Sequence, residues 1–130
     1  MAPTEGKREY WNGRIGLFQS EIEEIESYLR DTQNVVTPDG EDISEIMADR
    51  EVDLIQAKAA LRHAKVELMR IEREEEIARI IPQMNEARML IQQRLRQSDT
   101  AEAEEFRETL KRLEARVEEL RRDPDISEVD

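Results

Sequence analysis

The sequence predicts an all-α protein in which antiparallel helical hairpins, paired as coiled coils, are built around one long central helix. Charged residues make up 40% of the 130 residues and aromatic residues only 4%, which is the composition of long helices. Apolar residues recur at alternating spacings of four and three in three segments, as in a coiled-coil seam. The longest segment contains Pro82, which predicts a kink. The length leaves room for one domain, so residues 1–130 should form a single helical coiled-coil domain.

A first helix is predicted over residues 7–31. Its seam positions, spaced 4-3-4-3-4, are Trp11, Ile15, Phe18, Ile22, Ile25 and Leu29. The segment carries most of the aromatic residues of the chain, so we expect it to pack most densely.

A turn is predicted over residues 32–42. The segment 37–40 has Pro at its second position and Gly at its fourth, which fits a type I turn. Asp42 and Glu45 fit a capping box, so the next helix should begin near Ile43. Because the turn is short, the first helix should fold back antiparallel along the start of the next one.

The central helix is predicted over residues 43–97. Its first seam has Met47, Leu54, Leu61 and Leu68 at one heptad position and Arg50, Ala57, Ala64 and Ile71 at the other. The small Ala side chains would let a neighbouring helix approach closely. After an acidic run at 73–76, a second seam consists of Ile77, Ile81, Met84, Arg88, Ile91 and Leu95. It is shifted by one residue, which turns the apolar face by about 100°.

Pro82 lies at this change of register. Inside a helix, proline removes one hydrogen bond and clashes with the preceding turn, which costs about 3 kcal/mol. Ile81 is a poor N-cap, so a kink is favoured over a break. A mild kink would leave an elongated three-helix rod, whereas a sharp kink would let the hairpins stack into a four-helix bundle.

A last helix is predicted over residues 99–122. Asp99 and Glu102 fit a second capping box. The seam positions of this helix are Phe106, Leu110, Leu113, Val117 and Leu120. Pro124 ends the helix, and residues 123–130 should form a flexible acidic tail.

Charge and composition narrow the classes of partner. A net charge of -12 repels phosphate backbones and anionic membrane surfaces, and it suits a protein partner with a basic surface. No run of about 18 apolar residues occurs, so no membrane span is expected. The chain has no Cys and its start lacks a secretory h-region, so we expect it in the cytoplasm or inside a larger assembly such as a phage particle.

No catalytic, metal-binding or cofactor-binding residues are predicted, and the chain is not expected to be an enzyme. His63 is the only histidine, and Ala60 occupies the position where a helical di-iron site needs Glu. Phosphate-binding and nucleophile motifs rich in glycine are absent from a chain with four glycines.

Two groups of residues are candidate protein-binding positions. The hairpin tip contributes Val35, Val36, Pro38, Asp39 and Asp42. A presented binding element is one interpretation of this tip, and the other is that the valines pack on the helix ends while the aspartates turn and cap the chain. Surplus apolar positions outside the seams are Ile55, Val66, Ile80 and Leu90, which could enter a groove of another protein.

The segment Asp39-Gly40-Glu41-Asp42-Ile43-Ser44 resembles the D-x-x-D-x-A tip of DksA-type coiled coils. In that family the hairpin enters the secondary channel of RNA polymerase, so the resemblance implies a hairpin that acts on the polymerase. The match covers six residues and has Ser44 where the family has Ala. The Cys zinc module of the family is missing here.

These observations predict a non-enzymatic structural or adaptor protein that mediates protein-protein assembly through coiled-coil faces, with a homo-oligomer among the expected assemblies. The alternative is an acidic regulator or inhibitor of a nucleic-acid-binding protein. Such a regulator would act as a nucleic-acid mimic, because regularly spaced carboxylates imitate a phosphate array, or as a DksA-like hairpin.

Overall fold

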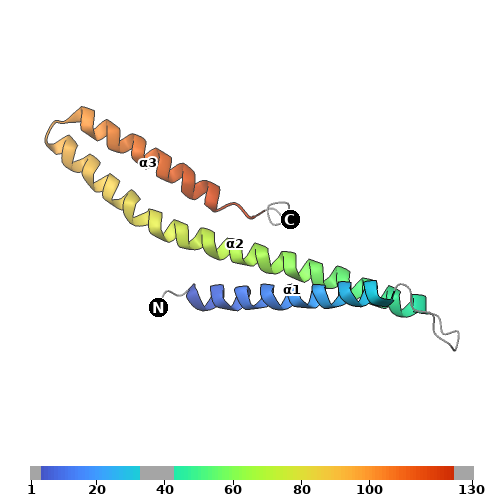
Figure 1. Ribbon diagram of the computed structural model, residues 1–130. Helices are drawn as coiled ribbons and strands as arrows, with labels where there is room; N and C mark the ends of the chain where they lie inside the picture. Colours follow the sequence, from blue (N-terminus) through green and yellow to red (C-terminus); the bar gives the residue numbers. More distant parts are fainter. Residues whose placement is uncertain (1–3, 33–42, 125–130) are drawn as a thin grey trace. The chain divides into compact units, whose positions relative to one another are not determined.

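A computed structural model describes residues 4–32 and 43–124, and all of its regular structure in these ranges is helical. Three helices follow one another along the chain: α1 (Glu5–Thr32), α2 (Ile43–Arg96) and α3 (Thr100–Leu120) (Figure 1). The all-α class is therefore confirmed. The predicted helices end within two residues of the observed ones.

The chain is divided into two compact units, and α2 contributes to both. One unit contains α1 and the part of α2 up to Leu68, and the other is Met69–Pro124, which contains the rest of α2 and α3. Each unit is a pair of helices, so each depends on a single seam for its core.

In the first unit, α1 runs antiparallel to α2. The ring of Trp11, near the start of α1, lies 5.6 Å from that of His63, whereas Tyr28, near its end, lies under the guanidinium of Arg50 at 5.1 Å. The predicted seam residues of α1 are all partly or fully buried, and Ala57 and Ala64 of α2 are 5% and 0% exposed. Small side chains at these two positions let α1 approach α2 closely, as expected from the sequence.

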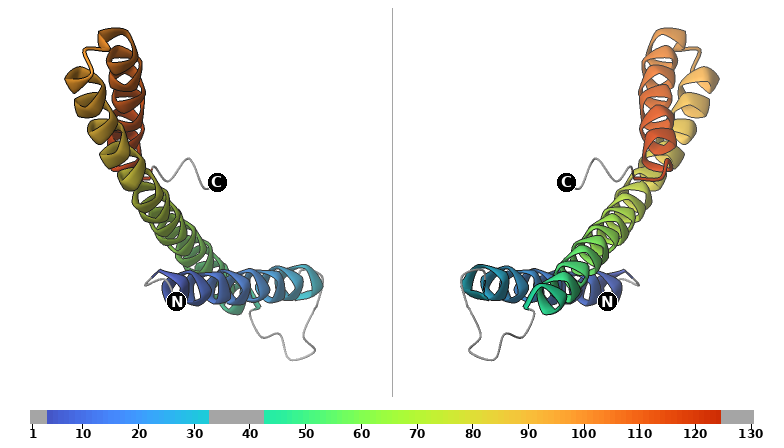
Figure 2. Two further views of the ribbon diagram at one scale, coloured as in Figure 1. Left: turned by 90° about the vertical axis from the view of Figure 1, so that its left-hand side faces the viewer. Right: turned by 90° about the vertical axis from the view of Figure 1, so that its right-hand side faces the viewer.

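In the second unit, α3 lies beside the last part of α2 in both views of Figure 2. Its core consists of Ile80, Val117 and Leu120, with Ile77, Met84 and Leu113 packed around them. In α1, only Ile25 is buried, with 5% of its surface exposed, whereas α3 has Ala103, Val117 and Leu120 buried. The expectation that the first helix packs most densely is therefore wrong. Large aromatic rings on a two-helix seam keep part of their surface in solvent, whereas branched aliphatic side chains of moderate size are covered.

The second seam of α2 uses a different set of positions from the one predicted. Ile81, Arg88 and Leu95 are exposed. The positions that alternate with Ile77, Met84 and Ile91 are instead Ile80 and Ala87, which are buried, and Arg94, which is partly buried. The change of register along α2 is thus two residues rather than one.

Electrostatics explains this choice of register. The predicted seam would bury the guanidinium of Arg88, which instead remains half exposed, 3.8 Å from Glu114. The observed seam places Arg94 at its end, where the guanidinium lies 6.0 Å from the ring centre of Phe106 and Nε lies 3.0 Å from Glu102 Oε1. The Arg94–Glu102 contact is an ion pair whose geometry does not make a hydrogen bond at Nε. Arg94 therefore keeps its charge compensated while its stem covers apolar surface.

Pro82 does not break α2, which continues through it as α-helix. The proline ring is exposed. Continuation through Pro82 agrees with the sequence interpretation, and the kink itself stays a prediction, as does the choice between a rod and a four-helix bundle.

The turn between α2 and α3 is built from hydrogen bonds of the Schellman type. Ser98 has a φ of 60°, and the N–H groups of Asp99 and Ser98 donate to the carbonyls of Arg94 and Leu95 at 2.9 and 3.1 Å. The carboxylate of Asp99 then accepts from the N–H of Glu102 at 3.1 Å, which confirms Asp99 as the N-cap of α3.

Arg116 joins the two helices of this unit along their exposed edge. Its Nε and Nη2 donate to the two carboxylate oxygens of Glu76 at 3.0 and 3.2 Å, and its Nη1 lies 3.3 Å from Glu119. The hydrogen bonds to Glu76 raise the pKa of the Arg116 guanidinium above its ordinary value. This bidentate contact aligns α3 against α2. It adds little to stability, because both side chains are partly exposed to solvent.

Candidate functional site

The predicted hairpin tip lies outside the described residues. This applies to Val35, Val36, Pro38, Asp39 and Asp42, and to most of the segment that resembles DksA-type coiled coils. The tip therefore stays a sequence prediction.

The surplus apolar positions fall into two classes. Ile55 is 65% exposed, and Leu90 is partly buried. Val66 and Ile80, in contrast, are 8% and 7% exposed, so neither is available to a partner. Ile80 is inaccessible to a partner because Val117 and Leu120 of α3 pack against it in the core of the second unit.

Ile55 belongs to a second, exposed apolar stripe on α2. Ala48, Val52, Ile55 and Ala59 are spaced 4-3-4, and all four are exposed, with Val52 at 51%. We call these four residues the outer stripe. Ile55 is two residues before buried Ala57, which corresponds to about 200° around the helix, so the outer stripe lies on the side of α2 away from α1.

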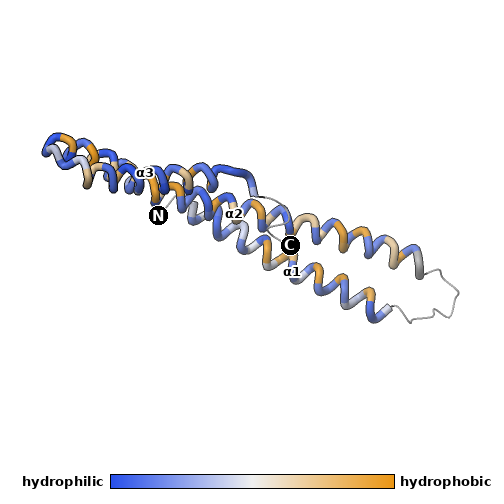
Figure 3. Tube along the Cα trace, turned by 90° about the horizontal axis from the view of Figure 1, so that it is seen from above, coloured by the Kyte–Doolittle hydropathy of each residue, from blue (hydrophilic) through white to orange (hydrophobic). Residues whose placement is uncertain are grey.

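The outer stripe continues the pattern of a coiled-coil seam, but none of the three described helices covers it. Hydrophobic positions recur along both α1 and the first part of α2 in Figure 3. On α2 they supply two heptad stripes, of which α1 covers the one that contains Ala57 and Ala64. Of the four residues of the outer stripe, the sequence analysis identified only Ile55 as a candidate. The 4-3-4 spacing around Ile55 could have revealed the other three.

Other exposed apolar side chains are scattered over the described helices. Those of α1 include Tyr10 and Leu17, and those in the second half of α2 are Ile81, Met89 and Leu95. Ile81 and Leu95 are each next to a buried or half-buried seam residue and border the α2–α3 contact. Single exposed apolar residues are normal on protein surfaces, whereas a continuous heptad stripe is not.

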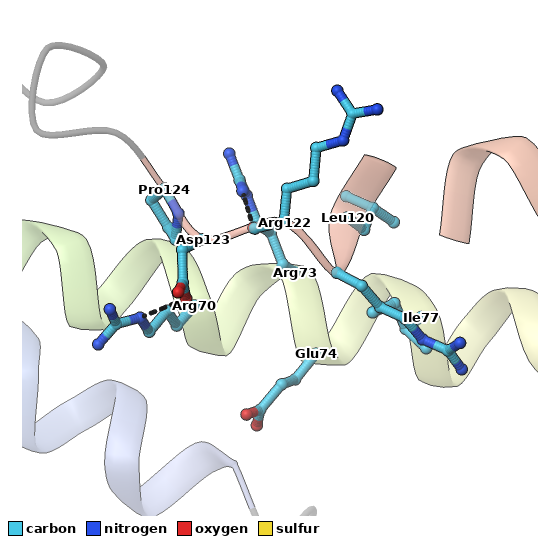
Figure 4. A pocket seen from close by; sticks show the side chains of 9 residues that line it. Arg70, Arg73, Glu74, Ile77, Leu120, Arg122, Asp123 and Pro124 are labelled. Carbon is cyan, nitrogen blue, oxygen red and sulfur yellow. Dashed lines mark hydrogen bonds and ion pairs between the residues drawn. The ribbon is translucent and has the colours of Figure 1, made fainter. Parts of the chain in front are cut away.

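A depression of about 250 Å³ lies at the C-terminal end of α3 (Figure 4). Its side chains hold the end of the helix in place. Arg73 Nη1 donates to the carbonyl of Arg122 at 2.6 Å, and Arg70 Nε lies 3.5 Å from Asp123 Oδ1. Pro124 is buried at its edge. At the start of the predicted flexible tail, Asp123 is thus ion-paired with Arg70 although its side chain is 86% exposed, and Pro124 is buried.

His63 contacts Trp11 through its ring and is exposed on α2. Among the described residues, no three His, Asp or Glu side chains are grouped so that they could hold a metal ion. Within 4–32 and 43–124, no helix combines the length and the apolar character needed to cross a membrane.

No protein-family model matches this chain, and no curated protein or solved structure matches it.

Proposed function

We propose that this chain is a non-enzymatic structural or adaptor protein that mediates protein-protein assembly through its coiled-coil faces. The observation that carries the proposal is the outer stripe of α2, where Val52 and Ile55 are more than half exposed at heptad spacing. Burying such a stripe against another helix removes apolar surface from water at about 25 cal/mol per Å². A helix that lies along it would complete a seam like the one that α1 completes on the other side.

The two-helix units support the same proposal. Each unit has a thin core, with ten buried hydrophobic residues among all those described. Chains of this kind gain much of their stability from further helices packed against them. A partner helix on the outer stripe would supply this additional burial.

The alternative of a nucleic-acid mimic has less support. Several carboxylates of the second unit form ion pairs with arginines, among them Glu76 with Arg116, Glu114 with Arg88 and Glu104 with Arg107. A phosphate-like array requires carboxylates that are not neutralised by neighbouring cations.

The proposal is tested by capture of partners from the native host with the tagged protein, followed by stepwise elution with salt. Partners held by the outer stripe should stay bound at high salt and should be lost with Ile55→Asp, while Met89→Asp, at a similarly exposed residue (62%), should retain them. Elution of a basic nucleic-acid-binding protein at modest salt would instead favour the acidic regulator. Equal capture by both variants would rule out the outer stripe as the assembly surface.

A further inference from the structure

The charges around the outer stripe are divided between its two ends. Glu45, one heptad before Val52, lies in line with the stripe at one end, and Arg62 lies in line with it at the other. On the flank of the stripe, Glu51 precedes Val52, and Lys58, whose Nζ also lies 3.9 Å from Glu26 Oε1 of α1, precedes Ala59. All these side chains are exposed. The stripe is thus acidic toward the start of α2 and basic further along.

These charges are complementary to those of a second copy of the outer stripe that runs in the opposite direction. In an antiparallel pair centred between residues 52 and 55, Val52 of one copy lies opposite Ile55 of the other, and Ala48 lies opposite Ala59. The same register places Glu45 of each copy opposite Arg62 of the other. It also brings Glu51 of each copy beside Lys58 of the other, so every one of these charged positions meets an opposite charge.

In a parallel pair, like charges would meet instead of opposite ones. It would place Glu45 opposite Glu45 and Arg62 opposite Arg62, and like charges at such positions destabilise a helix pair. The charge pattern therefore favours a second copy of this chain as the partner of the stripe, bound in the antiparallel direction.

We propose that the outer stripe of α2 is a self-association surface, on which a second copy of this chain binds antiparallel with Val52 against Ile55. The contact is two-fold symmetric and closes on itself, so it yields a dimer rather than a filament. The inference deepens the proposed function and rests on it, since it names the partner of the same assembly surface.

The small Ala side chains at both ends of the contact let the two helices approach closely, as they do beneath α1. From Glu45 to Arg62 the contact extends about 26 Å at 1.5 Å per residue. This is a short coiled coil, so we expect a dissociation constant on the order of micromolar or weaker.

Sedimentation velocity from micromolar to millimolar protein tests the proposal. The unaltered chain should pass from monomer to dimer over this range. Glu45→Arg and Arg62→Glu should each raise the dissociation constant by about tenfold, because each creates two like-charge contacts across the dimer. An equimolar mixture of the two variants should dimerise as the unaltered chain does, because both contacts of the mixed dimer then join opposite charges.

The control is Met89→Asp, which lies outside the stripe and should leave the dissociation constant unchanged. Circular dichroism should show the same helicity in Arg62→Glu and Met89→Asp as in the unaltered chain, and a small loss in Glu45→Arg, because Glu45 is the acidic residue in the first turn of α2. A chain that stays monomeric at every concentration overturns the proposal, and so do single variants that dimerise as tightly as the unaltered chain.

Disulfide trapping provides a second test that detects even a weak dimer, because the chain has no cysteine of its own. Oxidation of a mixture of Ala48→Cys and Ala59→Cys should yield mainly the mixed dimer. A parallel pair would instead join Ala48→Cys chains to one another.

The two proposals fail in different ways. If Ile55→Asp loses captured proteins of other sequence while the unaltered chain is monomeric, the assembly function stands and self-association is overturned. If the chain is monomeric and no captured protein depends on Ile55, both proposals are overturned.

Discussion

Ser98 determines how sharply the chain turns from α2 into α3. Its φ of 60° lies in the left-handed region, where an L residue with a Cβ loses about 1 kcal/mol or more relative to glycine. The Schellman hydrogen bonds of Asp99 and Ser98 hold it there. Glycine is the usual residue at this position because it adopts the conformation without steric cost.

Replacement of Ser98 by Gly should therefore stabilise the protein. We expect Ser98→Gly to raise the free energy of unfolding by up to about 1 kcal/mol, measured by urea denaturation followed by circular dichroism. Ser20→Gly, in the exposed interior of α1, is the matched control and should lower it by about 0.5–1 kcal/mol. Equal losses in the two variants would contradict a strained Ser98.

Asp99 has a separate role as the N-cap of α3, because its carboxylate accepts from the N–H of Glu102. Asp99→Ala should lower the free energy of unfolding by about 1 kcal/mol, whereas Asp99→Ser should retain most of it. Thermal unfolding at a fixed concentration would check the difference. A loss of similar size in Asp99→Ser would assign the effect to the negative charge near the helix start instead.

The pKa of Arg116 has little consequence for stability near neutral pH. A raised pKa of a cationic group contributes stability that is fully present below the unfolded-state value and is lost only as the pH rises through the folded-state value. For a guanidinium both values are strongly alkaline. The contact with Glu76 should therefore show no pH dependence from Arg116 across the neutral range.

At the scale of the element, small residues determine how closely the helices pack. Ala103 of α3 is fully buried, whereas Ala115 of the same helix is exposed. Ala103→Leu should lower the free energy of unfolding by about 1–3 kcal/mol because the larger side chain cannot be accommodated without moving the helices apart. Ala115→Leu should change it by less than about 0.5 kcal/mol. Urea denaturation of both variants would measure the difference, and equal effects would show that Ala103 is not confined.

α2 shows where periodicity alone was insufficient. Ile80 and Ile81 are adjacent, so either could belong to a seam with Ile77 and Met84. The sequence interpretation chose Ile81, which required Arg88 in the seam, and the structure uses Ile80 because Ala87 then follows it. A single-residue error of this kind leaves the helix correctly predicted but places its apolar face wrongly.

At the scale of the whole molecule, the division into two units predicts local effects of core mutations. Leu61→Asp places a carboxylate on the seam of the first unit, and Leu120→Asp places one in the core of the second. Hydrogen exchange should show that Leu61→Asp lowers protection mainly in α1, and that Leu120→Asp lowers it mainly in α3. Loss of protection in both helices from either substitution would show that the two units unfold together.

The all-α class, the bounds of α1, α2 and α3 to within two residues and the capping of α3 by Asp99 follow from the sequence alone. These features depend on local interactions along the chain, such as heptad spacing and hydrogen bonds between near neighbours. The same patterns identified Ile55 as a surplus apolar residue, but not the stripe of which it is part.

In contrast, the apolar stripe of α2 that a neighbouring helix covers is a property of the tertiary structure. It buried Val66 and Ile80, exposed Ile81 and left the outer stripe of α2 uncovered. The physical reason is that a heptad pattern states which residues share a face of a helix and not which face another helix will occupy. That choice depends on the side chains of both helices together, such as the fit of Val117 against Ile80.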